Sequence, residues 1–209
     1  MASVATRGSN STNRSKKSVF VTVGTTRFDA LIAAVDTPEF AQALLDKGYT
    51  YLIIQAGVSQ GYRPHRLFAN SSNNSATAAT APVAAPCSAT LPGGLYAEWF
   101  EYAPSLASYI KDASLVVSHA GAGSIFETLG RGTPLIAVPN AALMDNHQRE
   151  LAEKLEEDGH LAVATPENLM QVVLGFDASR LKPYTPGNGA GIVARVDSLC
   201  GVRRSKIDF

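Results

Sequence analysis

Short apolar runs alternate with amphipathic segments along most of the chain. The first run, 18–23, is rich in β-branched residues and stops at Gly24, as is typical of a strand buried in a parallel sheet. Similar runs predict further strands at 51–55, 95–102, 114–118, 134–138 and 160–164. Helical periodicity predicts helices at 29–47, where Pro38 interrupts the pattern, and at 104–112, 123–131, 146–158 and 166–174.

Strands that alternate with helices in this way predict βαβ units. We therefore expect an α/β fold, a Rossmann-like parallel sheet with helices on both of its faces. Right-handed crossovers place every strand-to-helix loop at the same edge of such a sheet. The loops 24–26, 119–123 and 139–145 are accordingly expected to converge, and the functional interpretation depends on this convergence.

Composition divides the chain into regions. Residues 1–17 are rich in Ser, Thr, Asn and Arg and lack the apolar core of a secretory signal, so we expect a disordered tail. The domain itself is expected at 18–181, with a flexible insertion at 58–94, since 69–90 is almost entirely Ala, Ser, Asn, Thr and Pro. Residues 182–209 begin as a loop and continue as an amphipathic helix, which packs either on the domain's own sheet or on a partner.

The overall composition excludes several classes of protein. With 45% hydrophobic and 17% charged residues, the 209-residue chain is expected to be globular. A formal net charge of zero offers no electrostatic case for nucleic-acid binding. The two cysteines, Cys87 and Cys200, form no disulfide framework, which fits a reduced, cytoplasmic compartment. No apolar run approaches the ~18 residues of a membrane-spanning helix, and no Asp-x-Asp pair indicates a metal site.

The turn 118–124 is the first candidate for chemistry. Its glycines, Gly121 and Gly123, allow the backbone to approach a ligand, and the following helix start offers free N–H groups and a positive dipole. This combination suits a diphosphate, although such turns also exist only to reverse the chain tightly. Phe126 occupies the third glycine position of the dinucleotide fingerprint, and no Gly-Lys-Ser/Thr of a P-loop follows.

Three further groups have both a structural and a functional interpretation. Glu127 either complements the helix dipole near the first turn or accepts hydrogen bonds from a ribose diol. His119 is either a structural residue or a contact for phosphate or proton transfer, because its pKa lies near neutrality. Asp145 and Gln148 either form a capping-box variant, or Asn146, His147 and Gln148 bind sugar hydroxyls.

The loop after the first strand is the last candidate. Gly24, Thr25 and Thr26 offer hydroxyls and backbone N–H groups that suit a phosphate or the acceptor substrate. The structural alternative is a simple turn in which Asp29 caps the next helix.

Taken together, these segments resemble one family closely. It is the cytosolic catalytic subunit of the UDP-N-acetylglucosamine transferase that adds the second GlcNAc to GlcNAc-pyrophosphoryl-dolichol in N-linked glycan assembly. Members carry a glycosyltransferase family 28 C-terminal domain. The chain also looks like the C-terminal half of the bacterial lipid-linked GlcNAc transferase of peptidoglycan synthesis, which has a GT-B fold. The resemblance covers about 19–183 apart from the insertion, on the stretches 19–29, 52–57, 115–127, 134–136, Asn140 and 143–152.

The resemblance implies an inverting transfer that forms a β1→4 bond, without a cofactor. By motif position, it implies that the turn Gly121, Ala122, Gly123 and Ser124 cradles the diphosphate and that Glu127 holds the ribose. It also implies that Asn146 and Gln148 hold the GlcNAc and that the segment from Phe100 to Tyr102 borders the uracil. His119 is a candidate general base, but the base is equally well placed on a partner and stays unassigned.

A GT-B enzyme places its active site between two halves, and this chain encodes one. The resemblance therefore implies a membrane-anchored partner subunit that completes the site, recruits the lipid acceptor and holds the chain at the cytosolic face of the endoplasmic reticulum. Two alternatives remain: a nucleotide-sugar-binding regulatory module without catalysis, and a small dinucleotide-dependent enzyme. Phe126 argues against the second alternative.

Overall fold

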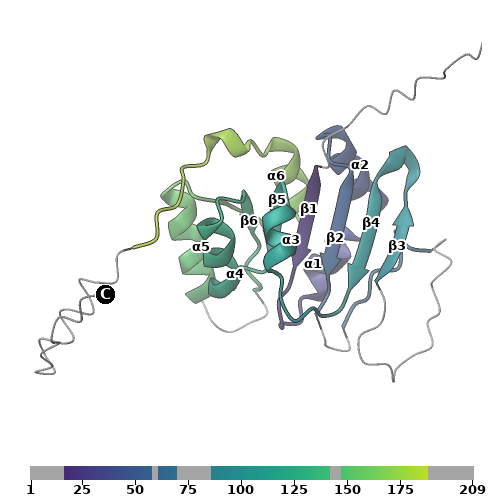
Figure 1. Cartoon of the computed structure of the whole chain (residues 1–209), viewed down its shortest axis with the longest axis horizontal. Coiled ribbons are helices and arrows are strands. Elements are labelled where there is room, and N and C mark those ends of the chain that lie inside the picture. The colour runs from purple at the N-terminus through teal and green to yellow at the C-terminus, as the bar shows by residue number, and fades with distance from the viewer. Residues whose placement is uncertain (1–16, 58–60, 70–85, 142–146, 188–209) are drawn as a thin grey trace, which may run out of the picture.

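The computed structural model describes residues 17–57, 61–69, 86–141 and 147–187. They form a seven-stranded sheet in the order β3-β4-β2-β1-β5-β6-β7 (Figure 1). All neighbouring strands are parallel except the edge pair β3 and β4. The strands are β1 (Ser18–Thr22), β2 (Tyr51–Gln55), β3 (Cys87–Thr90), β4 (Tyr96–Phe100), β5 (Leu115–Ser118), β6 (Leu135–Ala137) and β7 (Ala162–Val163).

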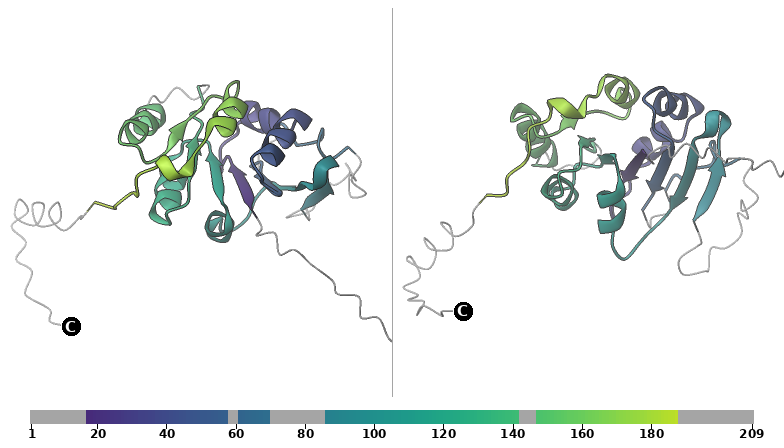
Figure 2. Two further views of the ribbon diagram at one scale, coloured as in Figure 1. Left: turned by 90° about the horizontal axis from the view of Figure 1, so that it is seen from above. Right: turned by 45° about the horizontal axis from the view of Figure 1, so that its top comes forward.

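Helices cover both faces of the sheet, which confirms the predicted fold class (Figure 2). One hydrophobic cluster joins the sheet to α1 (Asp29–Val35), α2 (Pro38–Asp46) and α6 (Leu169–Gly175). The other joins it to α3 (Ala107–Asp112), α4 (Ala122–Gly130) and α5 (His147–Glu157). Alternate residues of one strand supply the two clusters: Val19 and Val21 face the first, and Phe20 between them faces the second. None of the described helices is long and apolar enough to span a bilayer.

The predicted helix 29–47 is two helices in the structure. Pro38 is the first residue of α2, where its missing N–H needs no partner, and the Thr37 side chain accepts a hydrogen bond from the Phe40 N–H at 3.2 Å. The expectation that Asp29 caps α1 is wrong, because the N-cap is Phe28 and Asp29 is the first helical residue. Its carboxylate instead accepts hydrogen bonds from the Tyr62 N–H and from Arg27.

The predicted flexible insertion at 58–94 contains packed structure. Strand β3 pairs antiparallel with β4 and extends the sheet. The segment 61–69 is anchored by Asp36, a fully buried carboxylate that accepts hydrogen bonds from the backbone N–H groups of 65–67 and from the Tyr62 hydroxyl. These charge-assisted hydrogen bonds act together with the buried side chains of Leu67 and Phe68, which belong to the first hydrophobic cluster. Residues 58–60 and 70–85 lie outside the described part.

The predictions for the two ends of the chain concern mainly residues outside the described part. The tail at 1–17 is described only at Lys17, and the amphipathic stripe of the C-terminal segment falls within 188–209. Residues 182–187 are described and have no regular secondary structure, as predicted for the start of that segment. Tyr184 packs there against Phe126 of α4, with ring centroids 5.8 Å apart.

Candidate active site

Three strand-end loops meet at the carboxyl edge of the sheet. The His119 imidazole lies between the β1–α1 loop and the β5–α4 loop: a Cβ built on Gly24 would be 2.8 Å from its Cε1, and one built on Gly121 would be 2.4 Å from its Nε2. The β6–α5 loop joins them, since the Asn140 side-chain amide donates a hydrogen bond to the Arg27 carbonyl at 3.2 Å. The convergence predicted from the parallel topology is therefore present for 24–26, 119–123 and 139–141, while 142–145 lie outside the described residues.

The start of α4 is open at this meeting point. Gly121 is the N-cap residue and supplies no side chain to cap the helix, so the first N–H groups of α4 have no side-chain acceptor. A Cβ on Gly123 would meet no atom within 4 Å. The preceding Ala120 has a φ of 63°, a conformation that costs an L-residue energy and holds the chain in a sharp turn. The geometry matches an anion site in which backbone and dipole act together.

His119 is much less accessible than the sequence suggested. It is 7% exposed, and its Nδ1 is buried with no hydrogen-bond partner among the described residues, as is the Oγ of neighbouring Ser118. Burial lowers the pKa of His119 from its ordinary 6.5, while the Thr22 backbone opposes this shift. The imidazole is therefore neutral at pH 7 and fills the space between the glycine turns.

The shifted pKa of His119 predicts a loss of stability in acid. Its folded pKa lies below its unfolded value, so the unfolded chain binds more protons as the pH falls through about 6.5. We expect His119→Asn to remove this component, which amounts to at most about 1.4 kcal/mol per pH unit. Urea unfolding of both proteins at pH 7.5, 6.5 and 5.5 measures it. Equal pH dependence in the two proteins would contradict the assignment.

Gln55 is a residue of this site to which the sequence analysis gave no role. It is 1% exposed at the end of β2, and its Oε1 accepts hydrogen bonds from the Gly24 N–H (2.9 Å) and the Thr22 hydroxyl (2.6 Å). Its Nε2 donates to the carbonyls of Gly24 and Glu101, both at 2.8 Å. The sequence did contain a signal for this role: a polar residue ends an otherwise apolar strand. A buried amide needs several hydrogen-bond partners, so such a residue is expected to bind the neighbouring loops.

Glu127 lies on the exposed surface of α4, four residues after Gly123, so the two share one side of the helix. It is in the second turn, beyond the range in which the helix dipole acts strongly, and the dipole interpretation loses its support. Its carboxylate forms an ion pair with Arg131 at 3.2 Å, and its side chain is 40% exposed. The carboxylate thus has free acceptor capacity beside the open helix start.

The start of α5 is described only from His147. His147 is exposed and lies 4.0 Å from the Glu150 carboxylate, whereas Gln148 is half-buried. The Gln148 Oε1 atom is buried without a hydrogen-bond partner among the described residues, and its contact with a sugar stays a prediction. Asp145 and Asn146 lie outside the described part, and neither the capping box nor the sugar contact of Asn146 is tested.

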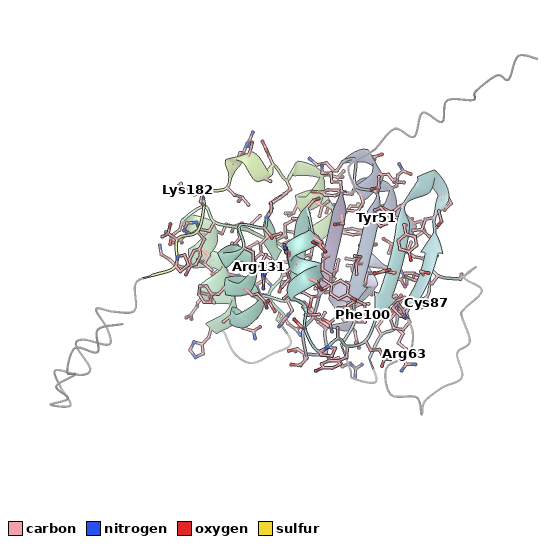
Figure 3. All side chains as sticks on the ribbon, in the orientation of Figure 1. Tyr51, Arg63, Cys87, Phe100, Arg131 and Lys182 are labelled. Carbon is pink, nitrogen blue, oxygen red and sulfur yellow. The ribbon has the colours of Figure 1, made fainter. Side chains whose placement is uncertain are left out.

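The aromatic residues expected beside the nucleobase differ in exposure. Phe100 lies at the carboxyl end of β4 (Figure 3), is 5% exposed and packs on Tyr109 with ring centroids 4.9 Å apart. The alternating position of Phe100 on β4 turns its ring into the core, so the ring is not exposed to a base, and the expectation that the segment from Phe100 to Tyr102 borders the uracil stays a prediction. Tyr102, two residues later, is 45% exposed and remains a candidate.

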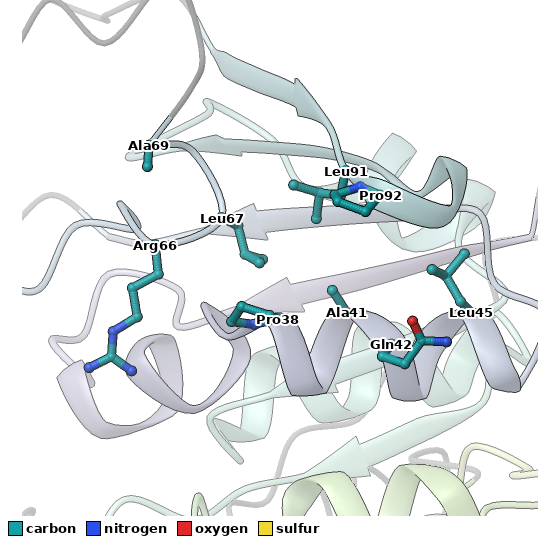
Figure 4. A pocket seen from close by; sticks show the side chains of 9 residues that line it. All are labelled: Pro38, Ala41, Gln42, Leu45, Arg66, Leu67, Ala69, Leu91 and Pro92. Atoms are coloured by element: carbon teal, nitrogen blue, oxygen red, sulfur yellow. The ribbon is translucent and has the colours of Figure 1, made fainter.

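A separate hollow of about 270 Å³ lies between α2, the segment 61–69 and the turn at 91–92 (Figure 4). Its walls are mainly apolar, with Gln42 and Arg66 as the polar exceptions. None of the loop residues that meet around His119 lines it, so this hollow is distinct from the candidate site. In the described ranges, no group of three or more His, Cys, Asp or Glu side chains is arranged to hold a metal ion.

The fold and the open helix start define a class of protein. The chain belongs to the glycosyltransferase family 28 C-terminal domain family, whose model matches residues 18–197. The domain is equivalent to the C-terminal half of a GT-B glycosyltransferase. MurG of Acinetobacter baumannii shares this fold, with a TM-score of 0.55 and 18% identity over 78% of this chain and 42% of that one.

Within the family, the chain is similar to UDP-N-acetylglucosamine transferase subunit ALG13. The human protein is 42% identical over 149 residues, 71% of this chain, and the Saccharomyces cerevisiae protein is 33% identical over 180 residues, 81% of this chain. An NMR structure of ALG13 has 27% identity and a TM-score of 0.59, covering 86% of this chain and 94% of that one. The match spans 11% of the human and 12% of the mouse protein, but 89% of the yeast protein.

Proposed function

We propose that this chain is the catalytic subunit of a glycosyltransferase that moves GlcNAc from UDP-GlcNAc to GlcNAc-pyrophosphoryl-dolichol. The observation that carries the proposal is the open N-terminus of α4, which lies where three strand-end loops meet. The similarity to proteins named UDP-N-acetylglucosamine transferase subunit supports UDP-GlcNAc as the donor. On this proposal the reaction is the second step of N-glycan precursor assembly.

Each part of the donor has a candidate partner. The diphosphate is bound by the N–H groups of the turn formed by Gly121, Ala122, Gly123 and Ser124. The Glu127 carboxylate accepts hydrogen bonds from the ribose hydroxyls, and Tyr102 borders the uracil. Gln148, for whose Oε1 the described residues offer no hydrogen-bond partner, accepts a hydrogen bond from a GlcNAc hydroxyl, together with Asn146 and His147 of the same segment. Gly24, Thr25 and Thr26 contact either the acceptor substrate or a phosphate of UDP-GlcNAc.

The chemistry is an inverting displacement. The 4-hydroxyl oxygen of the acceptor sugar attacks the anomeric carbon of GlcNAc, and the bond from that carbon to the β-phosphate oxygen breaks. The electron pair leaves with UDP, and the fixed N–H groups and dipole of α4 stabilise the growing negative charge. The acceptor proton passes to a general base. His119 is nearly inaccessible, so we assign it to shaping the loops and place the base on the partner.

A single Rossmann-like half has no opposite wall for its site. We propose that a membrane-anchored subunit provides that wall and binds the lipid acceptor, in a heterodimer at the cytosolic face of the endoplasmic reticulum. The word "subunit" in the names of the relatives supports a partner of this kind.

Reconstitution tests the proposal. The purified chain is mixed with membranes that contain the partner, UDP-GlcNAc labelled in the sugar, and a GlcNAc-pyrophosphoryl-lipid acceptor. We expect a labelled disaccharide-lipid that a β1→4-specific hexosaminidase cleaves, and no product when either protein is omitted. Absence of product in the complete mixture would refute the catalytic role.

The alternative is a regulatory module that binds the nucleotide sugar without catalysis. It predicts saturable UDP-GlcNAc binding in the same preparations with no disaccharide formed. Calorimetric titration alongside the product assay separates the two functions, because catalysis requires both binding and turnover.

A further inference from the structure

We infer that Gln55 is a positioning residue for sugar transfer: it fixes the backbone of the β1–α1 loop against the end of β4. This inference rests on the proposed function and deepens it, because it names what holds the β1–α1 loop of the site in place. Gln55 cannot contact a substrate directly, because it is only 1% exposed. It acts through the loops that it binds.

The first step of the argument is that the Gln55 amide is fully used. Its oxygen accepts two hydrogen bonds and its nitrogen donates two, all between 2.6 and 2.9 Å. Gly24 is held at both its N–H and its carbonyl. Gly24 has a φ of 61° and lies against the His119 ring, so its backbone conformation determines where the loop points.

The second step concerns which loop amides remain available. The Gly24 N–H is taken by Gln55 and Thr22, and the Thr26 N–H donates to the Val23 carbonyl at 3.1 Å. The Thr25 N–H has no acceptor in the described part of the chain, and the Thr25 side chain is exposed. Within 24–26, the Thr25 amide is therefore the N–H group for which the described residues offer no acceptor.

The third step is the link to β4. By donating to the Glu101 carbonyl, Gln55 ties the β1–α1 loop to the residue directly before Tyr102. Three neighbouring strands, β1, β2 and β4, thus end in a fixed relation to one another. An apolar side chain of the same size would fill the same space but would leave the two carbonyls without donors and the Gly24 N–H with only the Thr22 hydroxyl. The amide therefore specifies loop geometry that packing alone does not.

Two substitutions test this role. Gln55→Glu has the same shape but loses both donors to the two carbonyls. Thr22→Val removes one hydroxyl from the network at nearly constant volume, and Thr22→Ser keeps that hydroxyl as its matched control. In the reconstituted assay we expect Gln55→Glu to lower kcat about tenfold or more while KM for UDP-GlcNAc changes less than about threefold. Thr22→Val is expected to lose less, and Thr22→Ser to restore the wild-type rate.

Amide hydrogen exchange gives a readout that does not need activity. In Gln55→Met, which removes the amide oxygen at similar size, we expect the Gly24 amide to exchange about tenfold faster than in the wild type, with core strands unchanged. Thr22→Val keeps the Gln55 acceptor and is expected to speed exchange at Gly24 less. Leu52→Ala, in the core of the same strand, is the control for a general loss of stability. It should speed exchange throughout the sheet without lowering kcat per folded molecule.

Unchanged exchange at Gly24 in Gln55→Met would overturn the inference, as would a kcat loss in Gln55→Glu no greater than that of Leu52→Ala. A raised KM for UDP-GlcNAc at unchanged kcat would also overturn the inference, because the hydrogen bonds of Gln55 would then serve donor binding. If wild-type protein forms no product with its partner, the proposed function fails, while the exchange experiment still decides whether Gln55 holds the loop.

Discussion

Gly121→Ala is expected to lower the rate of sugar transfer about 100-fold. The new Cβ would lie 2.4 Å from the Nε2 of His119, a ring that is 7% exposed and blocked on its other side by Gly24. Either the ring or the turn at the start of α4 must move, and a shift of about 1 Å in a positioning group costs on the order of 100-fold in rate. Initial rates in the reconstituted assay measure the loss.

The same substitution is expected to destabilise the domain by about 1–3 kcal/mol, as overpacking usually does. Gly130→Ala is the matched control, because it lies in the same helix and its Cβ meets no atom within 4 Å. It should retain full activity and gain up to about 1 kcal/mol from the better helix propensity of Ala. Full activity of Gly121→Ala at wild-type stability would show that His119 and the turn do not constrain each other.

Glu127→Ala is expected to weaken use of UDP-GlcNAc roughly tenfold to a hundredfold. The lost interaction is a hydrogen bond between a carboxylate and the ribose hydroxyls, worth about 1.5–3 kcal/mol. Because the side chain is 40% exposed and packs in no core, the fold should remain intact. The measurements are KM and kcat/KM for UDP-GlcNAc, with thermal unfolding of the free protein.

Arg131→Ala separates the two roles of this carboxylate. It removes the Glu127–Arg131 ion pair but leaves the carboxylate in place. If Glu127 serves the ribose, Arg131→Ala keeps near-normal donor use while Glu127→Ala does not. If both variants keep the wild-type affinity for UDP-GlcNAc, Glu127 serves only as one half of a surface ion pair.

The apolar periodicity was sufficient to predict most of the architecture. Val19 to Val23 and 115–118 read as buried strands because parallel strands covered on both faces are almost continuously apolar. The parallel order then required their carboxyl ends to share one edge, and the loops at Gly24, His119 and Asn140 do meet there. The glycines of the 118–124 turn were recognisable because the local backbone needs them.

The misjudged elements depend on contacts between distant parts of the chain. Strand β3 has little apolar character, and it forms because β4 offers an unpaired edge. The segment 61–69 is held by the Asp36 carboxylate, 26 to 31 residues earlier in the chain. Local composition carries no information about either partner, so the Ala- and Ser-rich sequence before and within β3 predicts an unstructured loop.

By itself, the sequence determined the fold class, the approximate positions of most strands and helices, and the loops that meet at one edge of the sheet. Only the tertiary structure decided how individual side chains in those loops are used. The fold buries Phe100 against Tyr109 and encloses His119 between Gly24 and Gly121. It also gives Gln55 four hydrogen bonds to residues at the ends of two other strands. The physical reason is that periodicity records which face of an element is buried, whereas the partners of a polar group are set by residues that meet only after folding.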